Sequence, residues 1–405
     1  MEITRKSFLK SMLRVATTCG FLGTQGRNLL LAQEKARVPA KAAKIRDVEI
    51  YPFTLKQNVV IKIALPTALT TDNVFVLLRT EDGVTGVGEA SPYSAVTSET
   101  QQTDVAFAHT LADLVRGRDA FTIPKIVDDM DVLSPKNCSI KAAFEMALWD
   151  VCGKIAGLPI CCVLGKYRDS FETDKTIFIG TPAEMAEAAR AVVREGFRTI
   201  KVKVGESPEK DIARLEAIRE AVGNDIGLRI DANQGWTPAE AVRSLRGIER
   251  SHIQECEQPV PHWDMEGLKY VRDHSSVPIM ADESVHSPHD AIEAIRKDAV
   301  DLINIKLMKT GGILNAVRVA EISAAAGIQC MLGCMTETSL ALTAAAHVIA
   351  SQKSLVYADL DSFLFNASNP IIGGMEIKQG TVYLPNTPGL GLDIDPAFLK
   401  KLTPV

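Results

Sequence analysis

Five charged residues recur along the second half of the chain at nearly constant spacing. They are Lys203, Asp231, Glu257, Asp282 and Lys306, one every 24 to 28 residues. One short strand, one helix of about three to four turns and two loops together have this length. A charged residue at the same place in each unit puts all five around one rim of a barrel. The spacing therefore predicts a fold and a candidate active site together.

The segments between these positions alternate between strand and helix patterns. Residues 181–184 and 237–240 both read Thr-Pro-Ala-Glu, which predicts a capping box at two helix starts. Seven or eight strand–helix units fit between residues 175 and 365, which favours a closed parallel barrel over an open sheet. Strands are predicted at residues 200–204, 226–230, 277–280, 302–305 and 328–332. No G-x-G-x-x-G motif opens the first unit, which argues against a dinucleotide-binding domain.

The part of the chain before the barrel has a different pattern. Strand alternation surrounds the turn 81–83, which predicts an antiparallel hairpin, and helical periodicity follows from Ser98 to Gly157. We predict an α+β domain over residues 45–160, the barrel over 161–370 and a C-terminal segment over 371–405.

Composition limits the classes of partner. The net charge of −5 argues against nucleic acid as the main partner. No apolar run reaches the roughly 18–20 residues of a membrane-spanning helix. The eight cysteines are scattered, so buried thiols are expected rather than disulfides or a zinc site. Assembly into a homo-oligomer is left open.

The first 44 residues differ from the rest of the chain. Residues 5–10 resemble a twin-arginine export signal with Lys6 in place of the second arginine, and an apolar stretch at 11–22 is interrupted by Arg14. We predict export to the periplasm; the alternative is a disordered extension or a misassigned start on a cytoplasmic protein. In either case residues 1–44 stand outside the fold.

The three carboxylates predict a metal site. Asp231, Glu257 and Asp282 fall at the C-terminal ends of three successive predicted strands, where catalytic groups of such barrels lie. Three like charges directed at one place repel each other unless a cation lies among them. Ligation by oxygen alone suits Mg²⁺. For any one of the three, the alternative is an ordinary loop carboxylate.

The lysines predict proton transfer. Lys201 and Lys203 are two residues apart on one strand and point to the same face. Neighbouring ammonium groups and a dication disfavour protonation, so we expect a lysine pKa lowered towards neutrality. Lys306 lies three strands further round, beyond the carboxylates. This arrangement suits removal of a proton next to a metal-bound carboxylate, an enediolate held by the metal, and return of a proton from the other face.

At this point the motifs resemble a known family. Residues 201–203, 231–233, 257–259, 282–284 and 304–306 resemble the muconate lactonizing subgroup of the enolase superfamily, and the resemblance covers roughly residues 45–395. It implies a modified (β/α)7β TIM barrel with an α+β capping domain, to which the C-terminal segment returns. It also implies catalytic Lys203 and Lys306 and one Mg²⁺ on Asp231, Glu257 and Asp282.

A second motif narrows the expected substrate. Asp359 and Asp361 fall at the predicted eighth strand, and alternation puts both on one face, where two anions would bind an ammonium group. Their placement resembles the D-x-D motif of dipeptide epimerases, and a solvated turn is the alternative. The same resemblance implies substrate contacts from Thr176, Lys201, Cys334 and Met335, with Arg229, Asn304 and Glu337 behind them.

The expected lid over the site lacks one residue of the Ala-Glu epimerases. Those enzymes carry an arginine in the capping loop, whereas residues 56–73 contain none and include Leu65, Pro66, Ala68 and Leu69. An apolar lid favours a small or hydrophobic dipeptide. Lys56 or Lys62 could still reach a carboxylate, so Ala-Glu stays open.

Three functions are weighed. The first is an isomerase, a Mg²⁺-dependent dipeptide epimerase that inverts the α-carbon of the C-terminal residue. A muconate cycloisomerase or o-succinylbenzoate synthase would use the same lysines and metal but leaves Asp359 and Asp361 unexplained. The third is an exported, non-catalytic peptide-binding protein, which would tolerate loss of a lysine or of a metal-ligating carboxylate. None of these residues is missing, which argues against this hypothesis.

Overall fold

The structure is a computed structural model that describes residues 43–66 and 68–405. Ala43–Val405 form one compact unit. The unit begins just before the predicted boundary, since Ala43 is buried and Lys44 forms a β-bridge with Asp119. The predicted export signal lies outside the described residues and stays a prediction. Among the described helices, none has the length and hydropathy needed to cross a bilayer.

Eight parallel strands form the barrel, and each neighbours the next in chain order. They are β5 (Lys175–Ile177), β6 (Thr199–Lys203), β7 (Gly227–Asp231), β8 (Ile253–Glu257), β9 (Ile279–Ala281), β10 (Leu302–Ile305), β11 (Gln329–Leu332) and β12 (Leu355–Ala358). The first and last strands meet where the Asp174 N–H donates to the Ala358 carbonyl at 3.2 Å. The predicted strands are confirmed, with ends that move by one or two residues.

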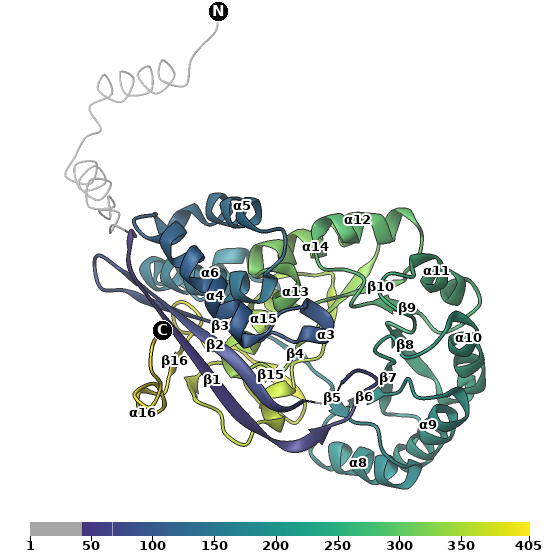
Figure 1. Cartoon of the computed structure of the whole chain (residues 1–405). Coiled ribbons are helices and arrows are strands. Elements are labelled where there is room, and N and C mark those ends of the chain that lie inside the picture. The colour runs from purple at the N-terminus through teal and green to yellow at the C-terminus, as the bar shows by residue number, and fades with distance from the viewer. Residues whose placement is uncertain (1–42, 67) are drawn as a thin grey trace, which may run out of the picture. The chain divides into compact units, whose positions relative to one another are not determined.

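Helices follow the strands and lie around their outside (Figure 1). They are α8 (Pro182–Arg194), α9 (Pro208–Val222), α10 (Pro238–Gly247), α11 (Met265–Asp273), α12 (Pro288–Arg296), α13 (Leu307–Thr310), α14 (Ile313–Ala325) and α15 (Ser339–Ser351), with the 3-10 turns η2 (Glu249–Ser251) and η3 (Ser362–Phe365). Both predicted capping boxes are present, at Thr181 of α8 and Thr237 of α10. These caps satisfy backbone donors that the first helical turn leaves without partners.

The N-terminal part packs a three-stranded antiparallel sheet against helices. The sheet has β1 (Ile45–Ile61), β2 (Ala68–Thr80) and β3 (Thr85–Ala90), and the helices are α3 (Ser94–Thr97), α4 (Gln101–Val115), η1 (Ala120–Thr122), α5 (Ile123–Leu133), α6 (Cys138–Ala156) and α7 (Ile160–Leu164). The predicted hairpin turn closes with the Gly83 N–H on the Thr80 carbonyl at 3.0 Å. Glycine at this turn has φ 82°, a conformation that costs other residues energy.

One carboxylate fixes this layer to the barrel. Glu89 of β3 accepts hydrogen bonds from the Thr338 N–H (2.9 Å), the Thr338 hydroxyl (2.7 Å) and the Ala341 N–H (3.2 Å). These donors belong to the N-terminal turn of α15, where an anion satisfies free N–H groups and the helix dipole. We call this set of contacts the Glu89 anchor.

The C-terminal segment runs back to the first strands. Its elements are β13 (Ile371–Gly373), β14 (Glu376–Lys378), β15 (Thr381–Tyr383), β16 (Leu392–Ile394) and α16 (Pro396–Leu399), and β15 pairs with β4 (Ser170–Glu172). Phe398 packs edge-on against Phe53 of β1, with ring centroids 6.0 Å apart. The Val405 N–H donates to the Ile50 carbonyl at 3.0 Å. Because elements on both sides of residues 160 and 370 pack together, those domain boundaries stay predictions.

A buried acid in α4 predicts how stability depends on pH. Asp104 is fully buried and neither carboxyl oxygen accepts a hydrogen bond. Burial, and then the charge of Glu99, raise the pKa of Asp104 to about 8. The unfolded value is about 3.9, so the stability that Asp104 contributes is full below that pH and falls by about 1.4 kcal/mol per pH unit up to about pH 8. In Asp104→Asn we expect thermal unfolding to lose this slope between pH 5 and 8.

The exposed Asp113 on the same helix supplies the control. Asp113→Asn should keep the wild-type slope, because its carboxyl group stays in solvent in both states. A slope in Asp104→Asn equal to that of the wild type would contradict the assignment of the proton to Asp104.

Candidate active site

The rim of the barrel brings the five periodic residues together. Lys203, Asp231 and Glu257 end β6, β7 and β8, while Asp282 and Lys306 directly follow β9 and β10. The strand order places the carboxylates between the two lysines. This is the arrangement that the spacing predicted.

Lys201 links two groups of carboxylates. Its Nζ lies 2.7 Å from Glu257 Oε2, 3.3 Å from Asp231 Oδ2 and 2.7 Å from Asp359 Oδ2. Lys203 Nζ lies 2.6 Å from the same oxygen of Asp231. Lys201 is 1% exposed and does not line the substrate-sized pocket at this rim. The structure thus places it beneath the substrate space, where it holds the carboxylates in place.

The other end of the site has a second pair of lysines. Lys306 Nζ lies 2.7 Å from Asp282 Oδ2, and Lys309 Nζ lies 2.6 Å from Asp282 Oδ1. Lys309 is fully buried and also donates to the carbonyls of Val285 and Asn304, each at 3.0 Å. Lys309 therefore fixes the loop that carries Asp282 to the end of β10.

The charges around two of the lysines favour their protonated forms in the protein without metal. Burial disfavours the Lys201 ammonium, but the charges of Asp359, Glu257 and Asp231 outweigh burial, so the pKa of Lys201 is raised well above its ordinary value. Burial likewise opposes the charge on Lys306, and the neighbouring carboxylates raise its pKa. The predicted lowering of a lysine pKa counted a bound dication, so it stays a prediction for the protein with metal.

The three carboxylates have the chemistry of a site for a hard cation. All three are fully buried, and Asn304 Nδ2 holds Glu257 Oε1 at 2.9 Å. Glu257 Oε2 and Asp282 Oδ1 each have a lysine ammonium as their partner, at 2.7 Å and 2.6 Å. Buried carboxylate oxygens whose partners are cations suit a divalent ion such as Mg²⁺. A group whose donor atoms lie closer together, Cys334, Asp359 and Asp361, stands elsewhere on the rim.

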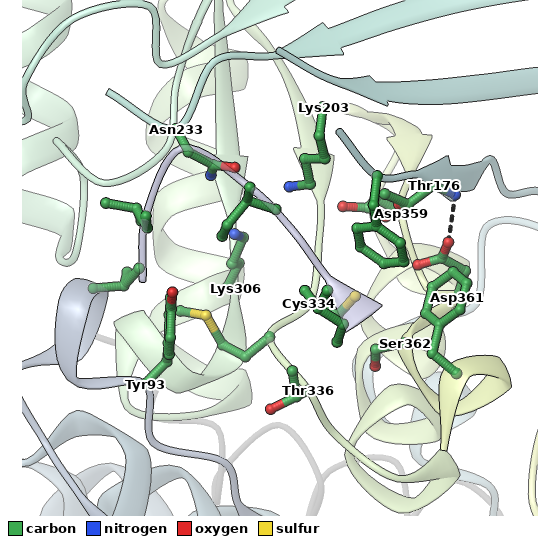
Figure 2. Close-up of a pocket in the computed structure, with 17 residues that line it drawn as sticks. Tyr93, Thr176, Lys203, Asn233, Lys306, Cys334, Thr336, Asp359, Asp361 and Ser362 are labelled. Carbon is green, nitrogen blue, oxygen red and sulfur yellow. Dashed lines mark hydrogen bonds between the residues drawn. The ribbon is translucent and has the colours of Figure 1, made fainter. Parts of the chain in front are cut away.

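A pocket opens above these groups (Figure 2). Lys203 and Lys306 line it, as do five of the six residues predicted to contact substrate: Thr176, Cys334, Met335, Asp359 and Asp361. Lys201 is the exception. The ammonium groups of the two lysines point into the same part of the pocket, and the two aspartates lie to one side of them.

The aspartate pair is built into the barrel rather than into a solvated turn. Asp359 and Asp361 are 3% and 2% exposed. Asp361 Oδ2 accepts the Thr176 N–H at 2.6 Å, and Asp359 Oδ2 accepts from Lys201. Burial opposes the charge on Asp359, but Lys201 outweighs burial and lowers its pKa, whereas burial and the charge of Asp359 raise the pKa of Asp361 to about 7.

The capping loop covers the pocket with apolar side chains. Ile61, at the end of β1, and Ile63 and Leu65, in the loop between β1 and β2, line the pocket. Lys62 points elsewhere: its Nζ pairs with Glu206 at 3.1 Å, and Glu206 in turn pairs with Arg214. Neither Lys56 nor Lys62 lines the pocket. Within the described residues, the loop supplies no cation to a substrate side chain.

Two family models match the chain. They are described as mandelate racemase / muconate lactonizing enzyme, N-terminal domain, over residues 46–165, and enolase C-terminal domain-like, over residues 184–398. The chain is 42% identical over 351 residues to the hydrophobic dipeptide epimerase of Enterococcus faecalis, covering 86% of this chain and 99% of that protein. The chain belongs to the dipeptide epimerase family of the enolase superfamily.

Further relatives carry other names within this family. The L-Ala-D/L-Glu epimerase of Bacillus subtilis is 40% identical over 361 residues, covering 88% of this chain and 98% of that protein. The solved dipeptide epimerase of Enterococcus faecalis, complexed with Mg and the dipeptide L-Leu-L-Tyr, superposes with a TM-score of 0.85 at 41% identity, covering 86% and 99% of the two chains. Membership of the family is thus shown, and the names of these relatives specify different dipeptide substrates.

For this dipeptide epimerase family member, sequence reasoning missed part of the pocket wall. The residues missed are Ile61, Ile63, Tyr93, Val96, Phe178, Asn233, Thr336, Ser362 and Phe365. Phe178 had a signal, because it lies two residues after Thr176 and so on the same face. Phe365 packs against Phe178 with ring centroids 5.0 Å apart, a contact across 187 residues that no local pattern reports.

Proposed function

We propose that the chain is a Mg²⁺-dependent dipeptide epimerase that inverts the α-carbon of the C-terminal residue and prefers hydrophobic dipeptides. The observation that carries this proposal is one pocket lined by two lysines, a buried aspartate pair and apolar side chains. The two lysines also pair with the carboxylate trio, through Asp231 and Asp282.

Asp231, Glu257 and Asp282 would hold the metal. Bound Mg²⁺ would stabilise the negative charge that develops on the substrate carboxylate as the α-proton leaves. Asn304 and Lys309 keep the ligands Glu257 and Asp282 in place through the hydrogen bond and ion pair described above.

Lys203 and Lys306 would move the protons. Each lies on its own side of the carboxylate trio, so a substrate carboxylate above the trio presents its α-carbon between the two ammonium groups. The lysine that lacks a proton takes the α-proton from one face, and the protonated lysine delivers a proton to the other face. The configuration inverts, and each lysine is ready for the opposite direction.

The aspartate pair would hold the free ammonium group of the dipeptide. Asp359 has a lowered pKa and carries its charge in a buried position, and an ammonium group bound beside Asp361 would favour the ionised form of that carboxyl as well. A cycloisomerase substrate without an amino group would leave both carboxylates without a partner. The pair also orients the dipeptide, because it fixes the N-terminus at one side of the pocket and leaves the carboxylate for the metal.

The side-chain preference follows from the walls. Ile61, Ile63, Phe178 and Phe365 offer apolar surface, and the nearest cation of the capping loop, Lys62, is held by Glu206. The relative named for hydrophobic dipeptides and its complex with L-Leu-L-Tyr support the same choice. A glutamate side chain would lose its hydration against these apolar walls, and the capping loop offers it no cation in the pocket.

The test is isotope exchange with matched dipeptides. Enzyme with Mg²⁺ in D₂O is incubated with L-Leu-L-Tyr, L-Ala-L-Ala and L-Ala-L-Glu, and mass spectrometry follows deuterium at the C-terminal α-carbon. We expect kcat/KM for L-Leu-L-Tyr to exceed that for L-Ala-L-Glu by roughly 10–200-fold, the range for one apolar contact. If no dipeptide exchanges its α-hydrogen, the proposed epimerase function is contradicted. If L-Ala-L-Glu exchanges faster than L-Leu-L-Tyr, only the proposed preference for hydrophobic dipeptides is contradicted.

A further inference from the structure

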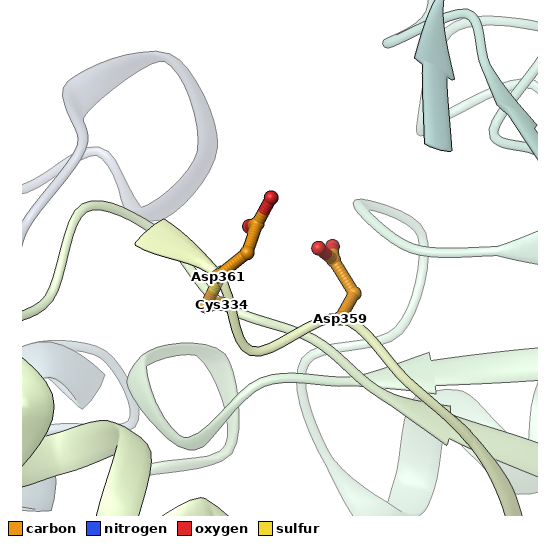
Figure 3. Close-up of side chains that lie close together, drawn as sticks. All are labelled: Cys334, Asp359 and Asp361. Atoms are coloured by element: carbon orange, nitrogen blue, oxygen red, sulfur yellow. The ribbon is translucent and has the colours of Figure 1, made fainter. Parts of the chain in front are cut away.

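Cys334, Asp359 and Asp361 form a second cluster of metal-ligand type, which we call the thiol–carboxylate cluster (Figure 3). One thiol sulfur and one oxygen from each carboxylate lie within 4.8 Å of one another. The cysteine follows β11 and the aspartates follow β12, so two neighbouring strand ends supply the three groups. The cluster lies outside the trio assigned to Mg²⁺ and lines the substrate pocket.

One donor of this cluster is free. Asp359 is 3% exposed, and its buried Oδ1 accepts no hydrogen bond, whereas Oδ2 accepts from Lys201 at 2.7 Å. Asp361 is held by the Thr176 N–H. Figure 3 shows the two carboxylates inclined toward each other. The unpaired, buried Oδ1 of Asp359 belongs to a side chain that lies beside a thiol and a second carboxylate, and a bound cation would give this oxygen a partner.

We propose that the thiol–carboxylate cluster is an inhibitory site for Zn²⁺ or a similar thiophilic dication. Such ions take three protein ligands and leave a fourth position open, with sulfur and carboxylate oxygen among the accepted donors. Donors of a tetrahedral zinc lie roughly 3.3–3.8 Å apart, so the side chains need to close by about an ångström through side-chain rotations. Mg²⁺ avoids thiols, which separates this site from the carboxylate trio.

Occupancy by metal and occupancy by substrate exclude each other because both need the same carboxylates. The free ammonium group of a dipeptide would bind to Asp359 and Asp361, and a dication would take one oxygen from each. When Zn²⁺ binds, the thiol proton leaves to solvent and a zinc–sulfur bond forms.

Cobalt is the spectroscopic probe. Co²⁺ is added to the full-length enzyme in excess Mg²⁺, and the near-ultraviolet thiolate-to-cobalt charge-transfer band is recorded. We expect the band in the wild type, its loss in Cys334→Ser and a weaker band in Asp361→Asn. Cys162→Ser, which changes an exposed cysteine, should keep it. A band that survives in Cys334→Ser, or no band in a folded wild type, would overturn the proposal.

Competition gives the second readout, and this part rests on the proposed function. Zn²⁺ should inhibit epimerisation competitively with the dipeptide. The inhibition constant should rise at least about tenfold in Cys334→Ser, since loss of even an outer partner of a bound metal costs 10–100-fold. If Zn²⁺ inhibits without competing with dipeptide, the site is not this one. If the wild type turns over dipeptides but shows no cobalt band, the inhibitory metal site is contradicted and the proposed function stands. If it shows the cobalt band but turns over no dipeptide, the proposed function is contradicted and the metal site stands.

Discussion

Alanine in place of Lys203 is expected to stop interconversion of the two epimers and to leave hydrogen exchange in one of them. In the proposed mechanism, Lys306 would still face one side of the α-carbon and would still take and return the proton there. Lys306→Ala should show the reverse, with exchange in the other epimer only. We expect epimerisation to fall by at least about 10²–10⁴-fold in each variant, the contribution of one general acid or base. Chiral chromatography measures inversion, and deuterium incorporation measures exchange.

The exposed Lys353 provides a control that removes a lysine without touching the pocket. Lys353→Ala should invert both epimers at the wild-type rate. Unchanged inversion in both Lys203→Ala and Lys306→Ala would refute the two-lysine mechanism. Exchange of both epimers in a single variant would instead show that one base reaches both faces.

Removal of the metal should have an effect of similar size. Chelation followed by gel filtration should lower turnover by at least about 10³-fold, because a bound dication supplies several kcal/mol of stabilisation to the developing charge. Added Mg²⁺ should restore turnover. Glu257→Gln should raise the Mg²⁺ concentration needed for half-maximal activity, since one charged ligand becomes neutral. The fold should survive in both cases, because lysines already pair with these carboxylates.

Glu376→Gln serves as the matched control, since it makes the same change on the surface. Its Mg²⁺ requirement should equal that of the wild type. Full turnover after complete chelation would refute metal dependence. Loss of the near-ultraviolet circular dichroism signal on chelation would show that the fold depends on the metal. It would also show that the lysines alone do not neutralise the carboxylates well enough to keep the protein folded.

The barrel and its rim could be predicted because their signal is local and repeated. Each strand–helix unit carries its own capping residues and its own charged residue, as in Thr237 and Asp231. The Asp359–Asp361 pair could be predicted from its motif, but the alternation argument was wrong, because both residues follow the end of β12 at Ala358. Contacts with Lys201 and with the Thr176 N–H hold the two carboxylates at the rim instead. The hydrogen bond from Asn304 to Glu257 also agrees with the outer position that the resemblance implied.

The rest depends on contacts between distant parts of the chain. Phe365 meets Phe178, and Ile61 meets the pocket, only after the sheet has closed and the capping loop has folded over it. Lys201 shows the limit most clearly: the strand pattern predicted its direction, but its three carboxylate partners come from three other strands. Those partners decide both its raised pKa and its burial below the substrate space.

The Glu89 anchor lies apart from the apolar cover of the pocket. The anchor joins β3 to the start of α15, whereas Ile63 and Leu65 line the pocket from the loop between β1 and β2. The loop has its own contacts with the barrel, namely the Lys62–Glu206 ion pair and the hydrogen bond from the Ile179 N–H to the Lys62 carbonyl at 2.9 Å. Substitutions of Ile63 and Leu65 would leave both sets of contacts in place, so these are the first positions to randomise in a laboratory search for new dipeptide substrates.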